Sequence, residues 1–204
     1  MNNQINKDDV FKFASNVNIG YIIGFHRFIL DELKKREDDL SYTIANFEGK
    51  HEDEIGILIE RNLYASIFKH QMIFSTFLLL YSHLEEWLYL IWKMYGNSIK
   101  LDSNNKGSIS RFKPIIQSAL SIELSADRKW QFLVEAETVR NCLLHANARI
   151  DLSTKRKMLV SIIKASSGSL YENNSRLYMN QKYLDDFVEC IQYLISKVES
   201  YDKT

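Results

Sequence analysis

The sequence contains few of the residues that terminate regular secondary structure. It has 1 proline and 7 glycines in 204 residues, which is roughly a tenth and a half of average usage. β-Sandwiches and barrels need many turns that contain Gly and Pro, and doubly wound α/β folds need Gly-rich loops after their strands. These shortages exclude both architectures and predict an all-α protein.

Cysteine is also scarce, and neither sign of charge dominates. Cys142 and Cys190 are far apart and form no C-x-x-C pair, which indicates a reducing compartment rather than a disulfide scaffold. Lys and Arg number 26 against 26 Asp and Glu. Zero net charge provides no general attraction for a polyanion, so nucleic-acid binding would need a local site.

Long apolar runs are missing as well. The most apolar stretch, residues 72–81, is followed by His83, Glu85 and Glu86, and falls short of the roughly 18 residues that a membrane helix needs. The polar residues 1–9 lack the apolar core of a signal peptide. We therefore expect a cytoplasmic protein with no membrane partner.

Apolar residues recur at helical spacing along most of the chain. The pattern predicts one domain over residues 1–204, an all-α helical bundle with long antiparallel helices. Residues 41–54 and 96–107 are polar and are expected to lie outside helices, and the second long helix is expected to bend or break near His70. The predicted helices cover residues 8–38, 54–95, 112–120, 127–148, 154–164 and 181–201.

The period changes between residues 169 and 179. Leu170, Leu177 and Met179 flank the pair Asn173-Asn174, and Asn tolerates the left-handed conformation that a tight hairpin turn requires. We expect a small β-hairpin near the C-terminal end.

The segment 130–149, most of which lies in the helix predicted to end near Ala148, carries the candidate chemistry. Phe132, Ala136, Val139, Leu143 and Ala146 form a stripe at three- and four-residue spacing, which should face the core. His145 lies about 200° around the helix from Leu143, and Asn141 lies one turn before His145. Arg140 is on the flank of this polar face.

These three residue types suit metal-free cleavage of RNA. An imidazole titrates near neutral pH and serves as general base or acid. A guanidinium binds phosphate oxygens and stabilises charge that develops on them. Attack of a ribose 2′-OH on the adjacent phosphate needs no further group, so we expect neither a metal nor a cofactor. Glu48 and His51 have the spacing of a carboxylate–histidine pair but lie in the polar stretch.

The run Arg140-Asn-Cys-Leu-Leu-His145 resembles the R-N-x-x-x-H signature of the HEPN superfamily. The residues 81–88, Tyr-Ser-His-Leu-Glu-Glu-Trp-Leu, resemble the acidic, aromatic-flanked long helix of that superfamily. The other Arg-Asn pair, Arg61-Asn62, has Ser66 where the histidine would stand. The resemblance covers roughly residues 74–201, but only the six-residue signature is specific to the superfamily.

The resemblance implies a small all-helical endoribonuclease. Arg140 and His145 would be the catalytic pair, and Asn141 an accessory polar residue. Family members commonly form homodimers in which two signatures face one RNA-binding cleft, and cleavage leaves a 2′,3′-cyclic phosphate. Many act in toxin–antitoxin or phage-defence systems, so an antitoxin protein is an expected partner. Other members are inactive, and a binding or scaffold module is the alternative interpretation.

Several further residues have two interpretations. Glu85 or Glu86 could position Arg140 across a helix pair, or could be solvated carboxylates. A cluster of cations after the signature could guide RNA phosphates, or could be a solvated charge run. Arg140 itself could simply pair with Glu137, and His145 could be a hydrogen-bonded helix-end residue. The cations concerned are Arg149, Lys155, Arg156 and Lys157.

Overall fold

The computed structural model describes residues 7–49, 51–96, 98–101 and 109–201, and the predicted loop at 96–107 falls largely outside them. The fold is mostly helical with one two-stranded hairpin, which confirms the predicted class. The elements in chain order are α1 (Lys7–Ala45), α2 (His51–Asn62), the π-helix η1 (Leu63–Phe68), α3 (Lys69–Tyr95), the 3-10 helix η3 (Ile109–Phe112), α4 (Lys113–Ala119), α5 (Arg128–His145), α6 (Arg156–Ala165), β1 (Leu170–Asn173), β2 (Arg176–Met179) and α7 (Gln181–Tyr201).

The first helix is longer than the sequence predicts. It continues through Ala45, and α2 begins at His51, so the expected polar stretch at 41–54 is helical at both ends. The hydroxyls of Ser41 and Thr43 donate to backbone oxygens four residues earlier, which lets polar residues remain in a helix. The prediction was wrong because polarity alone does not end an exposed helix.

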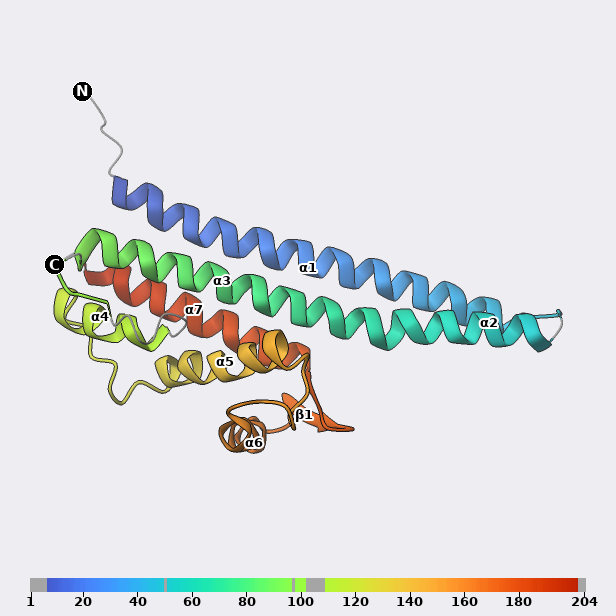
Figure 1. The fold of residues 1–204 in the computed structure, drawn as a ribbon. Coiled ribbons are helices and arrows are strands. Elements are labelled where there is room, and N and C mark those ends of the chain that lie inside the picture. The colour runs from blue at the N-terminus through green and yellow to red at the C-terminus, as the bar shows by residue number, and fades with distance from the viewer. Residues whose placement is uncertain (1–6, 50, 97, 102–108, 202–204) are drawn as a thin grey trace, which may run out of the picture.

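The helices form layers around α3 (Figure 1). α1 runs along one side of α3, α7 lies along another side, and α5 packs against α7. The hairpin and α6 lie near the C-terminal end of α5. This arrangement places α5 antiparallel to α3, so residues early in α3 are close to residues late in α5.

α3 supplies the centre of the core, as its apolar faces predict. Phe77 and Tyr81 are completely buried, and the ring of Phe187 from α7 packs 4.8 Å from that of Phe77. The continuous helical stretch Asp53–Tyr95 contains an 18-residue window with a mean hydropathy of 1.2, which is long and apolar enough for a membrane span. Core helices of soluble proteins share that composition, so this feature assigns no membrane location. The buried residues of α3 are Ile73, Thr76, Phe77, Leu80, Tyr81, Leu84, Trp87, Leu88 and Ile91.

The hairpin is present, with its turn one residue later than Asn173-Asn174 suggests. Asn173 pairs with Arg176, so Asn174 and Ser175 are the two central turn residues. Their φ angles are +50° and +60°, which a type I′ turn requires. The short turn brings β2 back beside β1 and presents Tyr171 and Tyr178 as a cross-strand pair.

Candidate active site on helix α5

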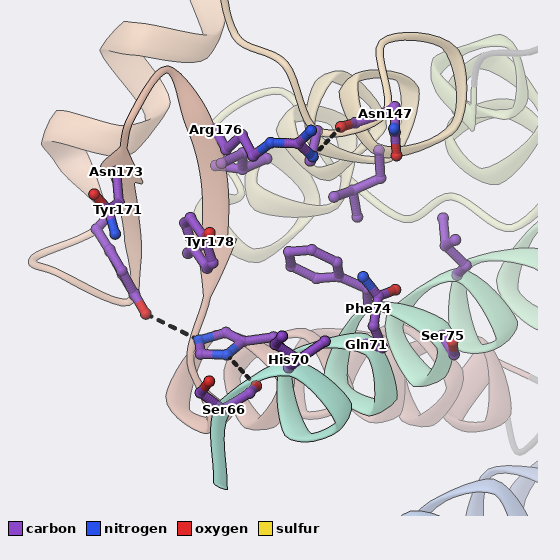
Figure 2. A pocket seen from close by; sticks show the side chains of 15 residues that line it. Ser66, His70, Gln71, Phe74, Ser75, Asn147, Tyr171, Asn173, Arg176 and Tyr178 are labelled. Carbon is purple, nitrogen blue, oxygen red and sulfur yellow. Dashed lines mark hydrogen bonds between the residues drawn. The ribbon is translucent and has the colours of Figure 1, made fainter. Parts of the chain in front are cut away.

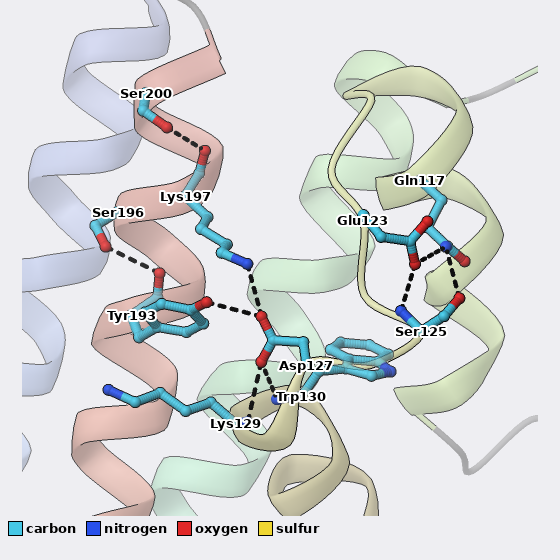
Figure 3. A network of polar contacts seen from close by, with 10 residues as sticks. All are labelled: Gln117, Glu123, Ser125, Asp127, Lys129, Trp130, Tyr193, Ser196, Lys197 and Ser200. Carbon is cyan, nitrogen blue, oxygen red and sulfur yellow. Dashed lines mark hydrogen bonds and ion pairs between the residues drawn. The ribbon is translucent and has the colours of Figure 1, made fainter.

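The start of α5 is held by Asp127. Its carboxylate caps the helix by accepting hydrogen bonds from the backbone amides of Lys129 and Trp130, both at 3.0 Å. It also accepts bonds from the side chains of Tyr193 (2.8 Å) and Lys197 (2.6 Å) on α7, as Figure 3 shows. One carboxylate therefore begins α5 and joins it to α7.

This environment determines the charge of Asp127. Partial burial alone would raise its pKa, but the bonds from Lys197, the Trp130 amide and Tyr193 outweigh burial and lower the pKa to about 2. Asp127 is therefore ionised at every pH where the protein would act.

The middle of α5 is enclosed on all sides rather than along one stripe. Of the predicted stripe, Ala136, Val139 and Ala146 are buried, whereas Phe132 and Leu143 are only partly buried. Glu137 and Thr138, on the face expected to be polar, are buried too. Exposure returns in the last turn of α5, so the candidate site is accessible because the helix emerges from the core there.

Arg140 lies where α5 meets α3. Its Nη2 atom is 4.0 Å from Oε2 of Glu85, and its Nη1 atom donates to Oδ1 of Asn141 at 2.9 Å. The guanidinium also lies over the ring of Tyr81, 5.7 Å from its centre. The side chain of Arg140 is 23% exposed. The guanidinium is thus held from three sides and still reaches solvent.

The groups around Arg140 form a partly buried polar cluster. Desolvation raises the pKa of Glu85, although the charges of Arg140 and Arg111 oppose the change. Burial also raises the pKa of Tyr81, whose hydroxyl has no hydrogen-bond partner among the described residues. Glu137 pairs with Lys155 at 3.5 Å instead of with Arg140. The alternative of an Arg140–Glu137 pair is therefore not what this structure contains.

His145 is the last residue of α5 and is exposed. Its side chain makes no hydrogen bond or ion pair with any part of the chain that the structure describes, and none joins it to Arg140. Five residues of α-helix separate the two Cα atoms by about 7.5 Å along the axis. The structure brings Arg140, Asn141 and Glu85 together and leaves His145 free at the helix end.

The two candidate accessory carboxylates lie on different faces of α3. Glu85 contacts Arg140. Glu86 lines a shallow hollow between α1 and α3 with Tyr21, Leu79 and His83. Only Glu85 is in a position to orient the guanidinium.

Two of the four cations after the signature are paired. Arg149 donates to both carboxylate oxygens of Asp151, at 2.9 and 2.6 Å, and Lys155 is paired with Glu137. Arg156 is exposed. Sequence spacing does not reveal these partners. Arg149 and Asp151 pair in the loop after a left-handed turn, and Lys155 pairs with Glu137, which belongs to helix α5.

Neither cysteine has the properties of a nucleophile. Both thiols are unpaired and buried, and burial raises the pKa of Cys142 and of Cys190 to about 11. The sulfur of Cys142 faces the carbonyl oxygen of Arg149 at 3.8 Å. Cys142 is a packing residue inside the signature.

A cavity between the hairpin and α3 was not predicted from the sequence. It has a volume of about 380 Å³ and is lined by residues of η1, α3, the end of α5 and both strands. Its polar groups come from segments about a hundred residues apart, including His70, Asn147 and Arg176. No local motif could reveal it. Within the described ranges, no group of three or more His, Cys, Asp or Glu side chains is placed to hold a metal ion.

We found no match to this chain among protein-family models, curated proteins or solved structures. Functional inference therefore depends on the residues and geometry of α5 and of the cavity.

Proposed function

We propose that the protein is a metal-independent endoribonuclease of HEPN type that acts as a homodimer in the cytoplasm. The observation that carries this proposal is the state of Arg140: a partly exposed guanidinium fixed by Glu85 and Asn141, on the helix that ends in the unpaired, exposed His145. A toxin or phage-defence role, with an antitoxin protein as partner, fits this activity.

In the proposed reaction His145 removes the proton from a ribose 2′-OH. The 2′ oxygen forms a bond to the adjacent phosphorus, and the bond from phosphorus to the 5′ oxygen breaks. The departing oxygen takes a proton from the partner's His145, which leaves a 2′,3′-cyclic phosphate and a 5′-OH. Arg140 stabilises the charge on the phosphate oxygens.

Arg140 retains donors for this task. A guanidinium has five N–H groups, and the contacts to Asn141 and Glu85 involve one nitrogen each. The remaining N–H groups are available to a phosphate. Asn141 and Glu85 orient the guanidinium and do not touch the reacting atoms.

The test is cleavage of single-stranded RNA in EDTA. We expect Arg140→Ala and His145→Ala each to lower the rate at least about a hundredfold, with cyclic-phosphate ends formed only by active protein. Arg61→Ala is a matched control, since Arg61-Asn62 repeats the Arg-Asn pair outside α5, and His51→Ala controls for an exposed histidine. Equal RNA decay by all four variants and the wild type would reject the proposal.

A binding module is the second candidate, and the Arg140–Glu85 contact favours it. An arginine that pairs across two helices has a structural use without catalysis. Innocuous expression together with tight RNA or protein binding that survives His145→Ala would support the module. Toxicity that disappears with His145→Ala would support the enzyme.

A further inference from the structure

The hairpin cavity has the composition of a site for a planar, anionic ligand. Three aromatic rings, Phe74, Tyr171 and Tyr178, line it beside the side chains of Leu78, Leu143 and Leu177. None of its described lining residues is acidic. A volume of about 380 Å³ lies in the range of small-molecule sites and excludes a duplex.

The two tyrosine rings are fixed before any ligand arrives. The ring of Tyr178 packs edge-on to His70 at 5.1 Å and stacks on Tyr171 at 5.4 Å. His70 Nδ1 donates to the carbonyl oxygen of Ser66 at 2.7 Å, and its Nε2 lies 3.1 Å from the Tyr171 hydroxyl. This chain of contacts joins α3 to the hairpin, so the rings have little freedom to lose on binding.

A cation and two amides line the same cavity. Figure 2 shows Arg176 and Asn147 at one rim of the cavity, His70 at the other, and Phe74 and Tyr178 between them. The guanidinium of Arg176 donates to the backbone carbonyl oxygen of Asn147 at 3.3 Å. No carboxylate of the described chain pairs with Arg176. The remaining guanidinium donors suit a phosphate, and the side-chain amides of Asn147 and Asn173 suit the polar edge of a base.

The backbone at this rim is held in an unusual conformation. Asn147 and Ala148, which line the cavity, have φ angles of +49° and +61°. The similar angles of Asn174 and Ser175 belong to the type I′ turn of the hairpin. Such conformations cost about 1–2 kcal/mol per residue outside glycine and concentrate at ligand sites. The Leu177 amide donates to the Ala148 oxygen at 2.8 Å, which locks the two turns together.

We propose that this cavity binds one nucleotide, with the base among Phe74, Tyr171 and Tyr178 and its phosphate on Arg176. Free mononucleotides and an unstacked residue of single-stranded RNA share this chemistry. For RNA, the inference rests on the proposed ribonuclease function. Leu78 lines the cavity and Glu85 contacts Arg140, so about 10 Å of α3 separates the two places. A short single strand could occupy both.

The experiment measures binding to the full-length protein by calorimetry. One arm uses AMP, CMP, GMP and UMP, and a second arm uses a 2′-O-methyl RNA decamer, which cannot be cleaved. Tyr178→Leu should weaken binding about 5- to 150-fold, which corresponds to loss of one base–aromatic stack. Tyr178→Phe should bind like the wild type, and Arg176→Gln should bind more weakly than Arg176→Lys.

The controls separate this inference from the ribonuclease proposal. Tyr21→Ala and Arg27→Gln remove the same chemistry from the exposed surface of α1 and should leave binding unchanged. Arg140→Ala and His145→Ala should still bind AMP, CMP, GMP or UMP even if they abolish cleavage. Mononucleotide binding identifies a free nucleotide as ligand, and binding of the decamer alone identifies RNA. Absence of binding in both arms, or equal binding by Tyr178→Leu, would overturn the proposal even if the protein cleaves RNA.

Discussion

At the scale of single residues, Asp127 has a pH-dependent effect on stability. Its folded-state pKa of about 2 lies below the ordinary value of 3.8, a difference worth about 2 kcal/mol. Because the folded pKa is the lower one, this stabilisation is complete above about pH 5 and disappears as the pH falls towards 2.

We therefore expect Asp127→Asn to lower the free energy of unfolding by about 2 kcal/mol at pH 7, and by much less near pH 2.5. Urea titrations at the two pH values measure the difference. Asp186→Asn is the matched control, since Asp186 forms an exposed pair with Lys182 and should change stability by less than about 1 kcal/mol. Equal losses for the two variants at pH 7 would contradict the prediction.

Glu85 offers a test of positioning. Removal of its charge by Glu85→Gln should let RNA phosphates approach Arg140 more favourably, while the guanidinium becomes less firmly oriented. In the proposed ribonuclease we expect KM and kcat both to fall, by about threefold or more each. If Glu85 had only a structural role, Glu85→Gln would lower the free energy of unfolding without the joint fall in KM and kcat. Glu86→Gln, on the other face of α3, should change neither constant.

At the scale of elements, His26 connects three helices. Its buried ring bonds Thr76 on α3 at 2.8 Å through Nδ1 and Gln181 on α7 at 2.9 Å through Nε2. His26→Phe leaves both partners without this bond, which should cost about 2–4 kcal/mol. Urea unfolding of His26→Phe, Thr76→Val and the double variant measures the coupling. His51→Phe, at an exposed site, is the control, and strict additivity would argue against the contact.

Replacement by glycine should change stability in opposite directions at a serine of the hairpin turn and at a serine of α6. Ser175 has a φ of +60°, so Ser175→Gly should relieve backbone strain and stabilise the protein by about 0.5 kcal/mol. Ser161→Gly, in the exposed face of α6, should destabilise it by about 0.5 kcal/mol. Thermal melts of the two variants should move in opposite directions, and a lower melting temperature for Ser175→Gly would refute the turn assignment.

The helices and hairpin were predictable because each depends on a local period. Pro114 in the first turn of α4 is a local signal, and so is a capping side chain before α5, although the sequence alone does not distinguish Ser125 from Asp127 as the cap. The burial of Glu137 was not, because it depends on Lys155 reaching it from before α6. The cavity was not predictable either, since its walls come from separate parts of the chain. Local order can be inferred from one sequence, but the pairing of distant side chains cannot.

At the scale of the whole molecule, neutral charge limits how RNA can bind. Arg149 and Lys155 are already paired with carboxylates, so two of the four cations that follow the signature are neutralised by the protein itself. Each phosphate contact to a single strand contributes about −0.7 to the slope of log affinity against log salt. We expect a slope shallower than about −4 for the decamer, measured by titration at several NaCl concentrations. A steeper slope would show that a larger basic surface contributes.

The π-helix η1 joins α2 to α3 with no non-helical residue between them. A π turn holds one residue more than an α turn. It therefore rotates the side-chain directions of the helix on one side of it relative to those on the other side. Removal of one residue from Leu63–Phe68 would restore α geometry and rotate α2 relative to α3 by about 100°. Then α1 could not follow both helices as one continuous partner. The irregular turn therefore sets the rotation of α2 about its axis relative to α3, so that the single helix α1 can pack against both.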